Sequence, residues 1–122
     1  LRAVAEVLKR AKLREARFEF ILKTAEPGDL VYFDPPYHPV SKTASFTSYH
    51  KSGFGEDSQR GLAEVAKQLT DRKVKVILSN SMTDLICELY RDFRIEEVFA
   101  TRSVNSKADR RGKISEAPVR NF

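Results

Sequence analysis

The sequence predicts an α/β fold built on a mostly parallel β-sheet. Two short segments, 30–33 and 74–78, are largely apolar, as is typical of strands buried in a parallel sheet. Apolar residues at helical spacing lie between them, and strands that alternate with helices indicate βαβ crossovers. A chain of 122 residues is long enough for one domain with one core, and no shift in composition marks a boundary within it.

The residues up to the first sheet strand predict a helix, a short strand and a turn. The helix follows from an apolar stripe at helical spacing, formed by Leu1, Val4, Ala5, Leu8 and Leu13. Segment 18–22 is a short apolar stretch and predicts a strand. Segment 27–29 (Pro-Gly-Asp) is a turn signal, and the run 30–33 that follows it predicts a strand covered on both faces.

The middle of the chain predicts a helix, a strand and a second, shorter helix. Asp57 or Ser58 is placed to cap the first of these helices. The apolar stripe of that helix is Leu62, Val65, Ala66 and Leu69. The strand at 74–78 ends at Ser79-Asn80-Ser81, and either Ser81 or Thr83 is placed to cap the short helix at 85–90.

The end of the chain predicts two more extended segments. Ile95, Val98 and Phe99 mark a third strand, a polar connection spans 105–112, and a last extended segment spans 119–122. Because a polar turn joins these two strands, we expect them to pair antiparallel.

Composition argues against several classes of site. Cys87 is the only cysteine, which excludes an internal disulfide and a cysteine-rich metal centre and fits a reducing cytoplasm. His38 and His50 lack the spacing of metal ligands, so we expect no metal. No apolar stretch approaches the length needed to span a membrane.

The segment Asp34-Pro35-Pro36-Tyr37, directly after the first sheet strand, is the most informative motif. The prolines stiffen the turn and remove two backbone donors, whereas their carbonyls still accept hydrogen bonds. A carboxylate and a free carbonyl can accept hydrogen bonds from an exocyclic amino group, and the aromatic ring can stack on the base that carries it. The alternative interpretation is a rigid turn in which the aspartate acts as a cap.

Ser79-Asn80-Ser81 ends the next sheet strand, at the edge where Asp34 also lies. Ligands of parallel sheets bind beyond the carboxyl ends of the strands, so this coincidence points to a site. For Asn80 the alternative is a capping or turn residue.

The net charge is +5 with a pI of about 9.5, and basic residues crowd the last stretch of the chain. Their charge fits either a solvated face or a polyanionic partner. These residues are Arg102, Lys107, Arg110, Arg111, Lys113 and Arg120.

Several segments together resemble one enzyme family, the DNA adenine-N6 methyltransferases of the Dam type. Segment 28–37 resembles the catalytic strand and turn of that family, and segment 46–50 resembles the aromatic block that follows it. Segment 77–80 looks like the next core strand. Segment 102–106, with Arg110 to Lys113, Glu116, Asn121 and Phe122, resembles the carboxy-terminal motif.

The resemblance implies the carboxy-terminal part of a Rossmann-like methyltransferase sheet, mostly parallel with a terminal antiparallel pair. It implies S-adenosylmethionine as methyl donor and double-stranded DNA as substrate. The glycine-rich cofactor loop and the target-recognition segment of the family are absent from residues 1–122, which we therefore expect to form a single partial domain. The missing partner would be the amino-terminal half of the enzyme, and the chain alone is expected to have weak or no activity.

The resemblance also implies roles for individual residues. Catalysis would involve Asp34, Pro35, Pro36 and Tyr37, and cofactor binding Phe18, Asp34 and Pro35. Arg17 stands where the family often has an acidic residue. The target base would contact Tyr37, Phe46, Tyr49 and Asn80. The DNA backbone would contact Lys42, Ser45, His50, Arg102, Asn105, Arg110 and Arg111.

Two alternatives stay open. A degenerate nucleic-acid-binding module would keep the scaffold without catalysis and would bind DNA in a salt-dependent way. The catalytic strand would also have an unpaired edge in this chain, which allows pairing with a second copy as a homodimer.

Overall fold

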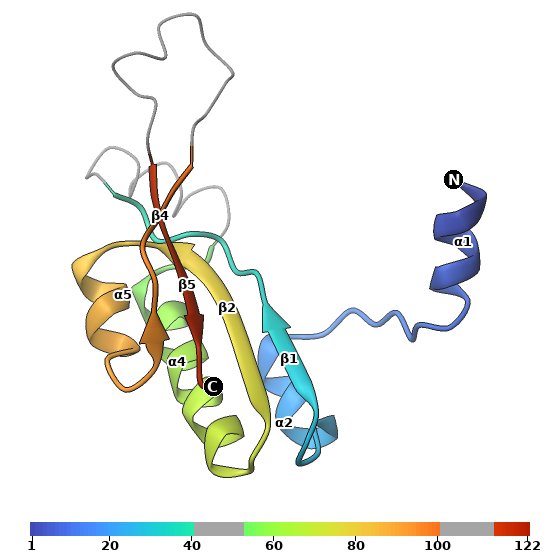
Figure 1. The fold of residues 1–122 in the computed structure, drawn as a ribbon. Coiled ribbons are helices and arrows are strands. Elements are labelled where there is room, and N and C mark those ends of the chain that lie inside the picture. The colour runs from blue at the N-terminus through green and yellow to red at the C-terminus, as the bar shows by residue number, and fades with distance from the viewer. Residues whose placement is uncertain (41–52, 101–113) are drawn as a thin grey trace, which may run out of the picture.

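The computed structural model describes residues 1–40, 53–100 and 114–122, which form a mixed α/β fold (Figure 1). The helical elements are α1 (Arg2–Leu8), a short 3-10 helix η1 (Phe18–Phe20), α2 (Ile21–Thr24), α4 (Glu56–Asp71) and α5 (Asp84–Leu89). The strands are β1 (Leu30–Phe33), β2 (Lys75–Ser81), β3 (Arg94–Ile95), β4 (Val98–Ala100) and β5 (Ile114–Arg120).

The strands form one sheet in the order β1-β2-β5-β3, and β4 also pairs with β5. β1 and β2 are parallel, whereas β5 is antiparallel to β2, β3 and β4. Strands β1 to β4 therefore share one direction and β5 alone runs the opposite way. The antiparallel pairing of the last strands is confirmed. The sequence did not predict that β5 inserts between β2 and β3, which leaves β1 and β2 as the one parallel pair in the described ranges.

Helix α4 supplies much of the core. Its predicted stripe is confirmed, since Leu62, Val65, Ala66 and Leu69 are all buried. The helix begins earlier than the predicted caps, with Gly55 at the N-cap, so Asp57 and Ser58 lie inside its first turn. Glu56 and Asp57 place negative charge in that first turn, and this stabilises the helix because the amino-terminal end of its dipole is positive.

Segment 18–24 is helical, and the predicted strand at 18–22 is wrong. Phe18, Ile21 and Leu22 are spaced i, i+3 and i+4, which places them on one helical face, and all three pack against the core. The sequence predicted a strand because neighbouring residues in this segment are apolar as well, so the helical spacing does not stand out.

β1 is covered on one face only, which corrects the prediction of a strand buried on both. Val31 is buried, but Leu30 and Tyr32 are 59% and 58% exposed on the opposite face. Figure 1 shows α2 behind β1 and α4 behind β2, on the same side of the sheet. Among the described residues no strand pairs with the outer edge of β1.

The first helix is shorter than predicted, because α1 (Arg2–Leu8) ends before Leu13, and it buries nothing. α1 has no buried residue and stands away from the sheet (Figure 1). The predicted third strand is divided in two: β3 and β4 are separated by Glu96 and Glu97, and the Glu96 N–H donates to the Pro118 carbonyl at 3.1 Å.

Candidate active site

The Asp34–Tyr37 turn and the end of β2 lie side by side, as predicted. In the β1–β2 register Phe33 is opposite Leu78, so Asp34 and Ser79 follow at the same edge. The Asp34 side chain is exposed. Within the described ranges nothing donates a hydrogen bond to its carboxylate or to the Pro35 carbonyl, so Asp34 acts as no cap there.

The Tyr37 ring lies in a partly polar setting at this edge. Its side chain is 37% exposed. Burial raises the pKa of the Tyr37 phenol above its ordinary value, and the charges of Glu116 and Asp34 raise it as well, while Ser79 lowers it. Next to it the hydroxyl groups of Tyr32 and Ser79 share a hydrogen bond of 2.9 Å.

Two buried amides hold the backbone of this turn. The Gln59 Nε2 group donates to the Pro36 carbonyl at 2.9 Å, and Asn80 Nδ2 donates to Gln59 Oε1 at 3.0 Å. Asn80 Oδ1 accepts from the N–H groups of His38 and Ser81, each at 2.8 Å. Gln59 and Asn80 are 1% and 0% exposed.

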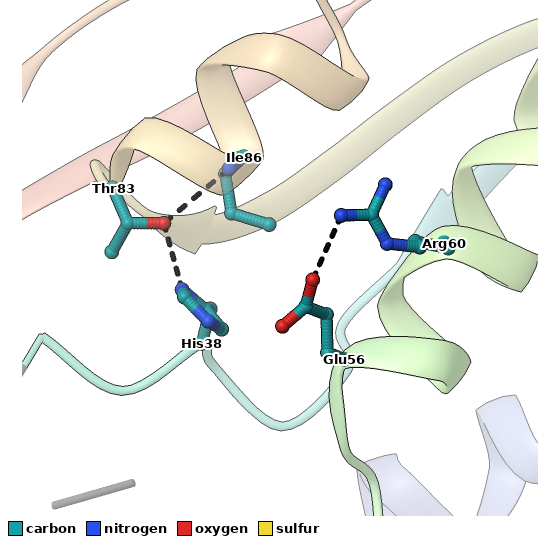
Figure 2. A network of polar contacts seen from close by, with 5 residues as sticks. All are labelled: His38, Glu56, Arg60, Thr83 and Ile86. Carbon is teal, nitrogen blue, oxygen red and sulfur yellow. Dashed lines mark hydrogen bonds and ion pairs between the residues drawn. The ribbon is translucent and has the colours of Figure 1, made fainter. Parts of the chain in front are cut away.

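The His38 ring adds a third attachment. Figure 2 shows it pointing at Thr83, whose Oγ1 lies 2.8 Å from His38 Nδ1. The same oxygen accepts from the Ile86 N–H at 3.3 Å, which confirms Thr83 as the cap of α5. Nearby, Arg60 and Glu56 form an ion pair of 2.7 Å on the first turns of α4 (Figure 2).

A cavity of about 410 Å³ lies beside β1, between this strand and segment 12–24. Phe18, Phe20 and Phe33 line it, and the Arg14 guanidinium lies 4.7 Å from the centre of the Phe20 ring. Phe18 also meets Phe54 edge to face, with 6.0 Å between ring centres. The apolar walls of the cavity can pack against a planar ring, and its cations can pair with a carboxylate, but no acidic side chain from the described ranges lines it.

The structure does not place Asn80 where a base can reach it. Its side chain is fully buried, and its amide oxygen and nitrogen already bond to the turn and to Gln59. The remaining predicted contacts lie outside the described residues. They are Lys42, Ser45, Phe46, Tyr49, His50, Arg102, Asn105, Arg110 and Arg111.

Sequence reasoning missed Gln59 and the attachments of His38. A signal for Gln59 was available: it lies three residues before Leu62 and seven before Ala66, so it is a polar residue on the apolar face of α4. For His38 there was none, because its partners Asn80 and Thr83 are more than forty positions away.

In the described ranges no three His, Cys, Asp or Glu side chains are grouped so that they would hold a metal ion. No helix in the same ranges is both long and apolar enough to cross a membrane.

Known proteins align with most of this chain. Type II methyltransferase M1.LlaDCHI of Lactococcus lactis subsp. cremoris is 47% identical over 111 residues, which cover 91% of this chain and 39% of that protein. Type II methyltransferase M.MjaIII of Methanocaldococcus jannaschii is 42% identical over 112 residues, which again cover 91% of this chain and 39% of that protein. The DNA adenine methylase of Escherichia coli K12 is 40% identical over 92 residues, which cover 75% of this chain and 33% of that protein.

The chain thus spans two fifths or less of the length of these relatives. Residues 1–104 match the family of D12 class N6 adenine-specific DNA methyltransferases. This match covers most of the chain and includes the Asp34–Tyr37 turn and the whole of α4 and β2. The chain belongs to the D12 class of N6 adenine-specific DNA methyltransferases.

Proposed function

We propose that this chain is the catalytic part of a DNA adenine-N6 methyltransferase that acts on an adenine flipped out of the duplex. The observation that carries the proposal is the Asp34–Tyr37 turn. It presents an exposed carboxylate and a carbonyl without a donor in the described ranges, at the sheet edge where ligands bind.

The chemistry required of the turn is alignment of a poor nucleophile. The lone pair of the adenine amino nitrogen is delocalised into the ring. Two acceptors for its hydrogens, the Asp34 carboxylate and the Pro35 carbonyl, favour a pyramidal nitrogen with an available lone pair. As the bond between the nitrogen and the methyl group forms, the bond between the methyl group and the sulfonium sulfur of the donor would break, and a neutral thioether would leave. The methylated nitrogen would then lose its extra proton to the Asp34 carboxylate or to water, so no prior deprotonation is needed. Rate enhancement then comes from orientation and fixed electrostatics.

Tyr37 is proposed to stack on the flipped adenine. Extrusion of a paired base costs a few kcal/mol, and one aromatic stacking contact returns about 1–3 kcal/mol. Phe46 and Tyr49 are proposed as further walls of the base pocket. The proposed contacts to DNA phosphates are those of Lys42, Ser45, His50, Arg102, Asn105, Arg110 and Arg111.

S-adenosylmethionine is the proposed methyl donor, and it supplies an electrophilic methyl group on a sulfonium. The cavity beside β1 fits part of such a molecule, because its aromatic walls suit an adenine ring and its cations suit a carboxylate. Phe18 is the proposed ring contact, and Asp34 and Pro35 are the proposed contacts near the methyl group. A negative charge on Asp34 also favours a neighbouring sulfonium cation.

The activity is proposed for a longer protein of which residues 1–122 are one partial domain. The chain spans 39% of the length of two relatives, and among the residues that the structure describes no acidic side chain lines the cavity to bind a ribose. The rest of such a protein, its amino-terminal half, would cover the open face of β1 and pair with its outer edge. A second copy of the chain is the alternative occupant of that edge.

The test is the identity of the methylated product. The longer protein should transfer labelled methyl groups to duplex DNA, and digestion should release N6-methyladenine without N4-methylcytosine. Salt-dependent DNA binding with no methylated base would reject the proposal and favour a binding module.

A further inference from the structure

We infer that Gln59 and Asn80 form a buried clamp that sets the position of the Asp34–Tyr37 turn during methyl transfer. Neither residue is exposed, so neither touches DNA or the methyl donor, and both are positioning residues. The inference rests on the proposed function, because the turn must be the group that is positioned.

The clamp grips the backbone on both sides of Tyr37. On the preceding residue the Pro36 carbonyl accepts from Gln59 on α4, and on the following residue the His38 N–H donates to Asn80 on β2. The 3.0 Å hydrogen bond between the two amides joins these attachments. The turn is therefore tied to a helix and to a central strand while the Asp34 side chain stays exposed.

The arrangement requires amides at both positions. Gln59 must donate to the Pro36 carbonyl and accept from Asn80 at once, which neither a carboxylate nor an alkyl group does. The Gln59 and Asn80 side chains are buried, whereas the hydrogen bond to the Pro36 carbonyl is only partly buried. A Pro36 carbonyl that lost its Gln59 donor would therefore shift toward another donor on its open side. Such a shift moves Asp34 and Pro35, and a displacement of about 1 Å at a reacting group can cost about 100-fold in rate.

If the two amides served stability alone, their loss would have a different effect on the measured rate. Loss of a purely structural amide pair lowers the amount of folded protein and leaves the rate per folded molecule unchanged. A positioning role lowers the rate of the chemical step in protein that is folded and still binds DNA. Single-turnover kinetics separate these cases.

The experiment uses the complete methyltransferase that carries this chain, with Gln59→Met as the test and Gln68→Met as the matched control. Gln68 lies on the same helix and its side chain has no hydrogen bond within the described ranges. We expect Gln59→Met to lower the single-turnover rate about 10- to 100-fold. We expect its Kd for DNA to stay within about threefold of the wild type, and amide hydrogen exchange at His38 to accelerate while that of Val76 is unchanged. Gln68→Met should match the wild type in all three.

If Gln59→Met does not fold, Gln59→Glu takes its place, since it keeps the size and the acceptor for Asn80 but loses the donor to Pro36. A single-turnover rate within twofold of the wild type in a folded variant would overturn the inference. So would unchanged exchange at His38. A wild-type enzyme without methyl transfer would instead overturn the proposed function, and the exchange comparison would still decide whether the clamp holds the turn.

Discussion

At Tyr37 the ring and the hydroxyl group make separable contributions. A tyrosine phenol has an ordinary pKa of about 10 and is neutral at physiological pH. Burial and the charge of Glu116 raise the pKa of the Tyr37 phenol further, so its ring is neutral. A neutral ring stacks on a base through its face, and this contact does not use the hydroxyl group. The role proposed for Tyr37 therefore depends on aromaticity.

Substitution separates the two contributions. Tyr37→Phe should keep kcat/KM within about threefold of the wild type. Tyr37→Ala should remove about 1–3 kcal/mol of stacking energy and so lower kcat/KM roughly 5- to 150-fold. Fluorescence of 2-aminopurine at the target position reports whether the base still leaves the stack. If Tyr37→Ala flipped and methylated the base as the wild type does, stacking on Tyr37 would have no place in the mechanism.

Among the elements, β5 pairs with β2 through the backbone, and one side chain, that of Asn121, also bonds to β2 and α4 at their junction. Asn121 Oδ1 accepts from the Val76 N–H at 2.8 Å, and its Nδ2 donates to Thr70 Oγ1 and to the Val74 carbonyl, each at 2.9 Å. These bonds fix the end of β5 to the start of β2 and to the last turn of α4. They stabilise the inserted antiparallel strand on which the order of the sheet depends.

Asn121→Ala should accordingly lower the free energy of unfolding by about 1–3 kcal/mol, because it leaves partly buried backbone groups without partners. Urea denaturation followed by circular dichroism measures the loss. Gln68→Ala is the control on α4 and should change the midpoint little. Equal midpoints for Asn121→Ala and the wild type would show that the junction is held by the backbone pairs of β5 alone.

The elements also show what the sequence could predict. The stripe of α4 and the strand Leu30–Phe33 were readable because local periodicity and apolar runs determine them. The insertion of β5 was not, since strand order is chosen by tertiary packing. The edge that carries Asp34 followed from the rule for parallel strands, but the Gln59–Asn80 bond joins residues 21 positions apart and needs the packed core to form.

The molecule as a whole has an open side. Leu30 and Tyr32 are more than half exposed on the uncovered face of β1, and no strand in the described ranges pairs with its outer edge. Natural sheets protect such edges, because unpaired N–H and C=O groups recruit other chains. The chain spans 39% of the length of two relatives, and in the longer protein proposed above further residues would cover this face.

Residues 1–122 on their own should therefore self-associate in a concentration-dependent way, as measured by sedimentation velocity. Leu30→Lys should shift the equilibrium toward the monomer, since an edge lysine opposes strand pairing. Gln68→Lys adds the same charge on α4 and should leave the equilibrium unchanged. A monomer at all concentrations would argue that the open edge is harmless in the isolated chain.

The most direct test of the account is the rate of methyl transfer after Asp34→Ala, measured in a single turnover by the complete enzyme on duplex DNA. Asp71→Ala, on the exposed end of α4, is the control. If the Asp34 carboxylate accepts a hydrogen bond from the adenine amino group, the rate of Asp34→Ala should fall by about 100- to 1,000-fold. The Kd for DNA should stay near that of the wild type. An Asp34→Ala enzyme that methylates adenine at the rate of Asp71→Ala would contradict the account.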